Sequence, residues 1–316
     1  PNIKFNERMM IDKLSEAIKS VYASAYFRDS KSYMAATLNM IDEEKMGIVL
    51  QEVTGRQYGD RFYPAISGVA RSVNFYPIAP EKPEDGIANI AFGLGKYIVD
   101  GGNGLRFSPR YPKKILQLST PELALSETQK TFYALDLKPE SFSPDPDETI
   151  NLMNLRIKDA ESDGSLRLVA STYDYESHQL REGVMGDGKR IITFSQALNH
   201  GSFPLAEILN EVLVIGQREM GKAVEIEFAV NLDMPKGQPR VFSLLQIRPI
   251  ASHDESINLN PSDIRTEDTL LISRSSLGNG IIKGISDLVY IRPESFDPSK
   301  SHDIAARLDK INARFM

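Results

Sequence analysis

Residues 224–250 hold two strand-like runs separated by a turn, and this segment constrains the fold more than any other. In the first run, apolar residues alternate with Glu225 and Glu227, and in the second run Gln246 and Arg248 stand two positions apart. Side chains two positions apart in a strand lie on the same face. The pattern therefore predicts two strands, each with a pair of polar side chains on one face.

The connection between these runs favours an antiparallel hairpin. Residues 231–240 contain Pro235, Gly237 and Pro239, which are typical of loops. If the strands pair, two carboxylates, one amide and one guanidinium converge on one surface. Carboxylates bind Mg²⁺ together with substrate phosphates, and a guanidinium offers planar donors to a phosphate. The set suits a metal-bound nucleotide, and the alternative is an amphipathic hairpin that carries a solvated salt bridge.

The composition excludes several classes of protein. The 316 residues are 41% hydrophobic and 25% charged, as in globular proteins, and the formal net charge is −6 at pH 7. That charge gives no support to nucleic-acid binding, and no apolar run approaches the ~20 residues that span a bilayer. The absence of cysteine excludes disulfides, zinc–thiolate sites and thiol nucleophiles. We expect a cytoplasmic protein with no nucleic-acid or membrane partner.

The N-terminal third alternates between helical and strand-like patterns. Helical spacing of apolar residues predicts a core-facing helix over 1–38, and the β-branched residues of 45–55 predict a buried strand. The block 62–75 predicts a further strand, in which Gly68 allows either close backbone approach to a ligand or a bulge.

The rest of the sequence predicts secondary structure clearly in some segments and poorly in others. An apolar stripe predicts a helix over 203–221, directly before the hairpin. Residues 122–182 are the least informative and are interpreted as an insertion or subdomain, with strands near 166–175. Near the C-terminus, we expect a strand over 286–292 and a helix over 304–315.

Two short strings in the hairpin resemble a known family. EIEF at 225–228 and LLQIRP at 244–249 resemble the end of the nucleotide-binding domain in the phosphoenolpyruvate synthase and pyruvate phosphate dikinase family. The resemblance implies an α+β, ATP-grasp-like fold with mixed and antiparallel sheets flanked by helices, incomplete at its N-terminus. It implies magnesium ligation by Glu227 and Glu225. It also implies that Gln246 and Arg248 are catalytic, with Arg248 contacting phosphate.

The resemblance extends upstream of the hairpin. It implies that Gln51, Glu52 and Val53 form the hinge that receives the adenine. Gly93-Leu94-Gly95 resembles the family's Gly-Leu-Gly-Glu segment, so Gly93 and Gly95 are expected to lie against the nucleotide. Lys96 stands where the named enzymes usually have Glu, and it takes no family role, with phosphate or water as its alternatives. The triplet 70–72, Ala-Arg-Ser, also departs from the family's Ala/Met-Phe-Thr.

The resemblance implies ATP and Mg²⁺ as cofactors of a phosphotransferase. In such enzymes ATP phosphorylates a carrier histidine, which passes the phosphate to pyruvate. We expect the carrier histidine, the pyruvate site and some of the phosphate-binding residues to lie outside this segment. The sequence is therefore expected to be a piece of a longer protein and to be inactive alone. The alternatives are a related dikinase with another acceptor, and a degenerate nucleotide-binding sensor or scaffold.

The expected domain organisation has four parts. ATP-grasp portions occupy 1–120, with the hinge, and 183–252, with the metal and phosphate strands. An insertion or subdomain occupies 121–182. A linker or the start of another domain occupies 253–316.

Overall fold

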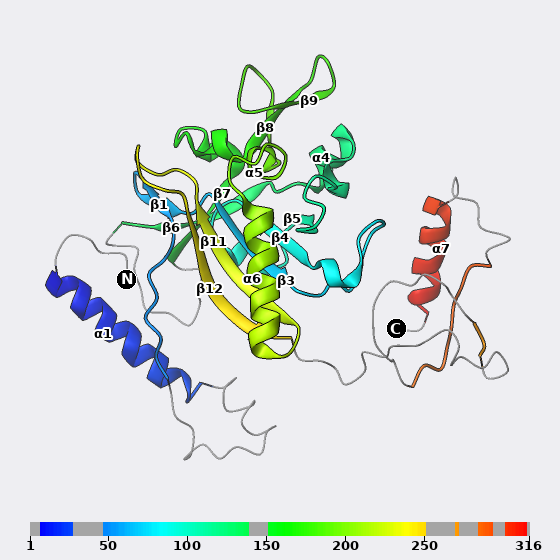
Figure 1. Ribbon diagram of the computed structural model, residues 1–316, viewed down its shortest axis with the longest axis horizontal. Coiled ribbons are helices and arrows are strands. Elements are labelled where there is room, and N and C mark those ends of the chain that lie inside the picture. Colours follow the sequence, from blue (N-terminus) through cyan, green and yellow to red (C-terminus); the bar gives the residue numbers. More distant parts are fainter. Residues whose placement is uncertain are drawn as a thin grey trace. The chain divides into compact units, whose positions relative to one another are not determined.

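The computed structural model describes residues 7–27, 47–138, 151–250, 269–271, 284–292 and 301–314. The chain divides into two units, Pro1–Ala251 and Ser252–Met316. The first unit combines helices with sheets whose strand pairings, within the described ranges, are all antiparallel (Figure 1). The predicted α+β class is confirmed.

A five-stranded sheet organises the first unit. Its spatial order is β12 (Val241–Pro249), β11 (Val224–Asn231), β3 (Ile66–Arg71), β4 (Ile87–Ala91) and β5 (Leu105–Phe107). The predicted hairpin is its β11–β12 pair, and the loop between them covers 232–240. Strand β12 therefore lies at one edge, while β11 is hydrogen-bonded on both sides.

Helix α6 (Leu205–Met220) packs on one face of this sheet (Figure 1). It confirms the helix expected over 203–221, and its buried stripe includes Leu209, Leu213 and Gly216. A Cβ on Gly216 would lie 2.7 Å from Ile247 Cδ1 and 3.2 Å from a Val224 methyl group, so the glycine lets helix and strands approach closely. Gly221 ends the helix in the left-handed conformation that glycine adopts without steric cost.

Two smaller sheets complete the core of the first unit. One has the order β1 (Arg56–Tyr58), β2 (Arg61–Tyr63), β6 (Thr131–Asp136) and β7 (Leu152–Arg156). The other has the order β10 (Lys189–Ile192), β8 (Ala170–Asp174) and β9 (Gln179–Glu182). An aromatic cluster of Tyr63, Phe92 and Phe132 joins the first of these sheets to the segment after β4, with ring centroids 4.8–5.3 Å apart.

Within the described ranges, the remaining α-helices are α1 (Glu7–Ser24), α3 (Lys96–Val99), α4 (Pro121–Glu127), α5 (Ser195–Leu198) and, in the second unit, α7 (Ser301–Asn312). At α4, the Thr120 side chain accepts a hydrogen bond from Leu123 N at 3.2 Å, and Pro121 occupies the first turn. Both are ordinary helix-start features. None of the helices within the described ranges is long and apolar enough to cross a membrane.

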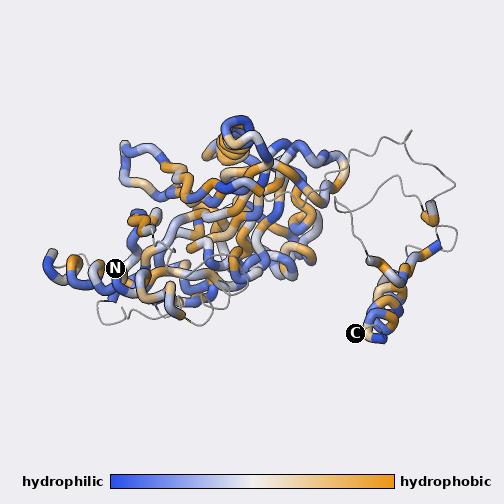
Figure 2. Tube along the Cα trace, turned by 90° about the horizontal axis from the view of Figure 1, so that it is seen from below, coloured by the Kyte–Doolittle hydropathy of each residue, from blue (hydrophilic) through white to orange (hydrophobic). Residues whose placement is uncertain are grey.

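The N-terminal helix is shorter than predicted. Helix α1 ends at Ser24, and residues 25–27 form a turn, whereas the expected helix continued to 38; positions 1–6 and 28–38 of that expected helix lie outside the described residues. Its apolar positions are not core-facing, because Met10, Ile11 and Tyr22 are each about half exposed. Figure 2 shows hydrophobic and hydrophilic positions alternating along this helix. The periodicity of the apolar residues thus predicted a helix correctly, but it did not predict which surface of the protein those residues contact.

The strand expected over 45–55 is wrong for the described part of that range. Residues 47–55 have no strand pairing, and Val49 and Leu50 are 88% and 67% exposed. The first strand begins one residue later, at Arg56. The β-branched composition favours an extended backbone, but it does not supply a neighbouring strand to pair with.

Other segments were predicted with mixed success. The strands expected near 166–175 correspond to β8, which is preceded by a short 3-10 turn over Ser165–Leu168. In the second unit α7 confirms a helix near 304–315, although it starts three residues earlier, and 286–292 forms no strand. Strand β2 pairs with β6 across the predicted boundary at residue 120, and the four domain ranges stay a prediction.

Candidate functional site

Two rows of facing residues cross the five-stranded sheet. One row contains Asn89, Val69, Glu227 and Gln246, from β4, β3, β11 and β12. The other row contains Ile87, Arg71, Glu225 and Arg248 from the same strands. Val224 and Ile247 face α6, so the alternation of strand side chains places both rows on the opposite face. This polar face is the candidate site.

The register shifts between Glu227 and Phe228 where β11 pairs with β12. Leu245 is the extra residue on β12, because Gln246 faces Glu227 and Leu244 faces Phe228. The strict alternation predicted for the second run therefore breaks at Leu245. Gln246 and Arg248 lie beyond the shift, where they face Glu227 and Glu225. The convergence of acid, amide and guanidinium groups expected from the sequence is present.

Glu225 is buried between two arginines. Its Oε2 accepts a hydrogen bond from Arg71 Nε at 2.5 Å, and its Oε1 accepts from Arg248 Nε at 2.8 Å and also from Arg248 Nη2. Burial by itself raises the pKa of Glu225, but the hydrogen bonds and charges of the two guanidinium groups outweigh it and hold the pKa below its ordinary value. Glu225 is thus an ionised group whose oxygens already have donors.

Arg71 is the site residue that sequence reasoning missed. It was noticed only as part of a departure from a family pattern, although it lies two positions after Val69 and therefore shares a face with it. In the structure the Arg71 side chain is 47% exposed and Arg248 is 60% exposed, so both guanidinium groups reach solvent beside the buried carboxylate of Glu225. The missing signal was the pairing of β3 with β11, which a single sequence does not reveal.

Glu227 is the carboxylate on this face that suits a metal. It is partly exposed, and its charge lies close enough to raise the pKa of Arg248 further, after the larger contribution of Glu225. Among the described residues, no group of three acidic or histidine side chains is arranged to hold a metal ion by itself. Mg²⁺ commonly takes one or two carboxylates together with substrate phosphates, and Glu227 with the neighbouring Gln246 fits that type of donor set.

The three predicted hinge residues run beside the edge strand of the sheet. Gln51 Nε2 donates a hydrogen bond to the Leu245 carbonyl at 3.1 Å, at the position where the β12 register shifts. Gln51, Glu52 and Val53 are all exposed. A few residues further, Asn231 Nδ2 donates to the Gly55 carbonyl at 2.8 Å. The segment thus follows β12 from its middle toward the loop.

Gly93 and Gly95 form the turn that leads from β4 into α3. Gly93 has φ +86°, and a Cβ there would lie 2.7 Å from the Tyr133 carbonyl oxygen, so this position requires glycine. The Gly93 carbonyl accepts a hydrogen bond from Ser67 Oγ at 2.5 Å, and a Cβ on Gly95 would lie 3.7 Å from Ser67 Cβ. Ser67 belongs to β3 and lies four residues from Arg71, so the turn adjoins the polar face.

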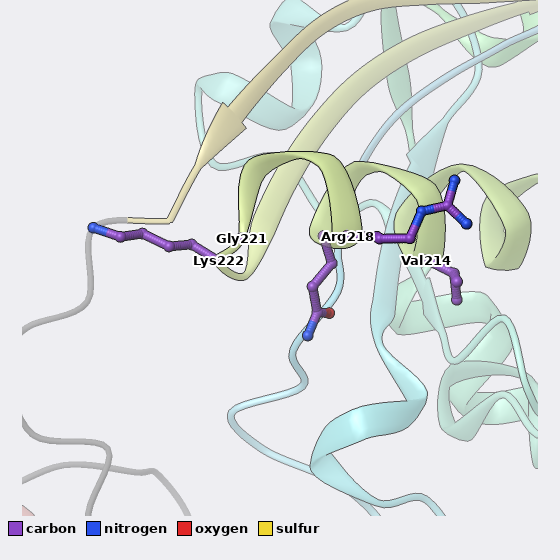
Figure 3. Close-up of a pocket in the computed structure, with 5 residues that line it drawn as sticks. Val214, Arg218, Gly221 and Lys222 are labelled. Atoms are coloured by element: carbon purple, nitrogen blue, oxygen red, sulfur yellow. The ribbon is translucent and has the colours of Figure 1, made fainter.

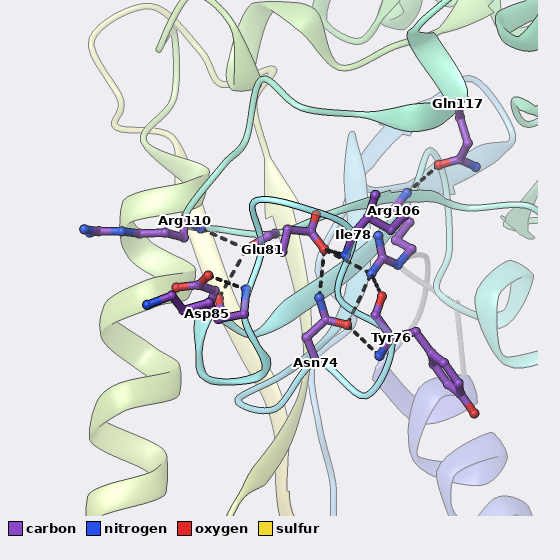
Figure 4. Close-up of polar contacts among 10 residues, drawn as sticks. Asn74, Tyr76, Ile78, Glu81, Asp85, Arg106, Arg110 and Gln117 are labelled. Carbon is purple, nitrogen blue, oxygen red and sulfur yellow. Dashed lines mark hydrogen bonds and ion pairs between the residues drawn. The ribbon is translucent and has the colours of Figure 1, made fainter. Parts of the chain in front are cut away.

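The side chains of Lys96 and Arg106 are two further cations that already have protein partners. Lys96 Nζ forms an ion pair with Asp100 Oδ1 at 3.0 Å, one turn along. Arg106 bonds to the Tyr76 carbonyl at 2.8 Å, to Asn74 at 3.2 Å and to Glu81 at 3.3 Å (Figure 4). The Arg106 guanidinium therefore anchors the loop between β3 and β4.

Gly68 serves the opposite face of the sheet. It lies between Phe228 and Ile90 in the pairing register, and a Cβ on Gly68 would come within 2.5 Å of Phe228 Cζ and 2.9 Å of an Ile90 methyl group. The bulge considered from the sequence is wrong, because Gly68 pairs in regular register on both sides, whereas close approach to a ligand stays a prediction. The glycine accommodates an aromatic ring of the core.

A hollow of about 500 Å³ lies elsewhere, at the C-terminal end of α6 (Figure 3). It is lined by Val214, Gln217, Arg218, Gly221 and Lys222, none of which was predicted as a site residue. Arg218 pairs with the adjacent Glu219 at 3.0 Å, and both side chains are about two-thirds exposed. These residues provide matched controls for the polar face.

Comparison with known proteins identifies the family. The chain matches the model of the pyruvate phosphate dikinase AMP/ATP-binding domain over residues 6–269, and no curated protein matches it. The match includes both rows of the polar face, the Gly93–Gly95 turn and the middle segment 121–182. ATP binding and a kinase-type phosphotransferase are the activities that this family indicates. The chain therefore belongs to the pyruvate phosphate dikinase family and carries its AMP/ATP-binding domain.

Proposed function

We propose that the polar face of the five-stranded sheet binds the phosphate end of Mg²⁺-ATP. In the complete protein, we propose, ATP phosphorylates a carrier histidine that passes the phosphate to pyruvate, as in phosphoenolpyruvate synthase-like enzymes. The observation that carries the proposal is the pair of facing rows, which brings Arg71, Glu227, Gln246 and Arg248 onto one surface. Two cations and a partly exposed carboxylate are the groups that a metal-bound polyphosphate requires.

The proposal gives each residue a distinct role. Glu227 holds Mg²⁺, which when bound neutralises phosphate charge. Arg248 contacts the transferring phosphate, and Gln246 orients it. Glu225 was predicted as a second metal ligand, but its hydrogen bonds to both guanidinium groups support a different role, which is to orient Arg71 and Arg248 toward the phosphates.

We place the adenine along the segment of Gln51, Glu52 and Val53. Its exposed backbone runs beside β12, on which Arg248 lies, so the base and the phosphates would occupy one continuous surface. Gly93 and Gly95 border the same face through Ser67 and offer backbone that a nucleotide can approach closely. The predicted cytoplasmic location belongs to this proposal.

An ATP titration of the Arg248→Ala variant tests the phosphate role. Loss of a charge-assisted hydrogen bond of about 1.5–3 kcal/mol lowers affinity by roughly 10- to 100-fold. The matched control is Arg218→Ala, which removes a similarly exposed guanidinium at the end of α6 and leaves ATP affinity unchanged. An equal loss in both variants, or in neither, contradicts the proposed role of Arg248.

A degenerate nucleotide sensor or scaffold is the second candidate. The observation in its favour is Lys96, which pairs with Asp100 and occupies the position where the named enzymes usually have Glu. The two candidates differ in turnover. Mg²⁺-dependent ATP binding by the full-length protein without ATP consumption, across pyruvate and other acceptors, favours the sensor, whereas consumption with pyruvate supports the phosphotransferase.

A further inference from the structure

A cleft of about 670 Å³ lies between the two smaller sheets. The start of β6, the end of β7 with the turn that follows it, and the start of β10 line the cleft. This volume falls within the range of ordinary small-molecule sites, about 300–1,000 Å³. The cleft shares no lining residue with the polar face of the five-stranded sheet.

The cleft is strongly basic. Five cationic side chains line it, namely Lys130, Arg156, Lys158, Lys189 and Arg190. The acidic side chains in the lining are Glu161 and Asp187, which leaves an excess of three positive charges. The whole chain has a net charge of −6, so this concentration of positive charge is opposite in sign to the molecule that carries it. Such a surface attracts anions.

The cationic side chains differ in whether they already have hydrogen-bond or ion-pair partners within the protein. Arg190 is held by Glu161 at 2.8 Å and by Thr172 Oγ1 at 2.9 Å, and it forms the fixed wall of the cleft. Lys158 and Lys189 are exposed, and neither ammonium group has a hydrogen-bond or ion-pair partner within the residues described. They are therefore available to a ligand.

Lys130 indicates that these charges crowd one another. Its Nζ donates a hydrogen bond to the Leu125 carbonyl, which holds the ammonium group in one position. Partial burial lowers the pKa of Lys130, and the positive charge of Lys189 lowers it further. The charges of Lys130, just before β6, and of Lys189, at the start of β10, thus repel each other across the cleft, and a bound anion would relieve that repulsion.

We propose that this cleft binds a small anion with several phosphate groups. Lys158 and Lys189 would contact its phosphates directly, while Arg190 and Lys130 set the surrounding positive field. A polyphosphate matches the excess of three charges better than a single carboxylate does. The proposal does not depend on ATP binding at the polar face.

Titration with inorganic tripolyphosphate in the absence of Mg²⁺ tests the proposal. We expect saturable binding that weakens steeply with salt, and a loss of affinity of at least tenfold in the double variant Lys158→Ala/Lys189→Ala. The matched control is Lys113→Ala/Lys114→Ala, which removes two exposed lysines outside the cleft and leaves the affinity unchanged. Thermal unfolding of each variant checks that it is folded.

Three outcomes overturn the proposal. The first is no binding, and the second is an equal loss in the control double variant, which indicates attraction by overall charge alone. The third is loss of tripolyphosphate binding in Arg248→Ala with no loss in Lys158→Ala/Lys189→Ala, which assigns the anion to the polar face. Conversely, Lys158→Ala/Lys189→Ala should keep the wild-type affinity for Mg²⁺-ATP, so the two sites are tested separately.

Discussion

The two faces of the five-stranded sheet use the same strands for different purposes. On the face that includes the α6 contact, Phe228 of β11 packs over Gly68 and stacks on Phe242 with ring centroids 5.2 Å apart. On the other face, Glu225 and Glu227 of the same strand lie beside arginines and an amide. Adjacent residues of one strand thus support the core and the candidate site, so neighbouring substitutions should separate stability from binding.

The largest effect on stability is expected from Phe228→Ala. The ring is 1% exposed, and its removal leaves a cavity between Gly68 and Phe242. Such truncations cost about 3–5 kcal/mol in the free energy of unfolding, which a urea titration measures. The neighbouring Glu227→Gln should change this free energy by less than about 1 kcal/mol. Similar losses in both variants would contradict the division between the faces.

A smaller loss is expected from Gly68→Ala. The added methyl group overlaps Phe228 Cζ at 2.5 Å, and overpacking of a core costs about 1–3 kcal/mol. Combining it with Phe228→Leu should recover part of this loss, because a shorter side chain leaves room for the methyl group. Strictly additive free energies of unfolding in the double-mutant cycle would show that the two positions do not contact each other.

A smaller stability loss than that of Phe228→Ala, and one that depends on pH, is expected from Glu225→Gln. The pKa of Glu225 is lowered from its ordinary value of 4.5 in the folded protein, so its ionised form stabilises the fold above that pH. At neutral pH, the variant should be less stable by about 1–2 kcal/mol, the size of a charge-assisted hydrogen bond. The difference should shrink as the pH falls through 4.5 and below, where wild-type Glu225 becomes protonated.

Urea titrations of wild type and variant at several pH values measure this difference. A difference that stays constant from neutral pH to below 4 would mean that the charge of Glu225 does not hold Arg71 and Arg248. This pH dependence is expected only for substitutions on the polar face, because the side chains that contact Phe228 on the other face have no titratable groups.

The elements predicted correctly were those whose pattern is local. Alternation in β11 and the stripe of α6 reflect which side of a single element is buried, and a sequence states this directly. Arg71 was missed and 47–55 was misassigned for the opposite reason, because both depend on which strand lies beside them. Arg71 joins the site because β3 pairs with β11, and 47–55 stays unpaired although its composition favours a strand.

The same reasoning explains why Glu225 and Glu227 looked equivalent. Both alternate with apolar residues, but the pairing register places Glu225 between two arginines and Glu227 between Val69 and Gln246. The two carboxylates therefore differ in burial and not in sequence spacing. Glu225 is buried and paired with charges, whereas Glu227 remains accessible. Magnesium binding by Glu227 stays a prediction.

The Mg²⁺ dependence of ATP affinity, compared between wild type and Glu227→Gln, tests the central proposal most directly. The substitution keeps the size of the side chain and removes its charge, and unfolding of the variant verifies that the sheet is intact. We predict that Mg²⁺ strengthens ATP binding by the wild-type protein and that this gain falls at least tenfold in Glu227→Gln. An unchanged gain in the variant, or ATP binding by the wild type that does not respond to Mg²⁺, would contradict a metal-nucleotide site on the polar face.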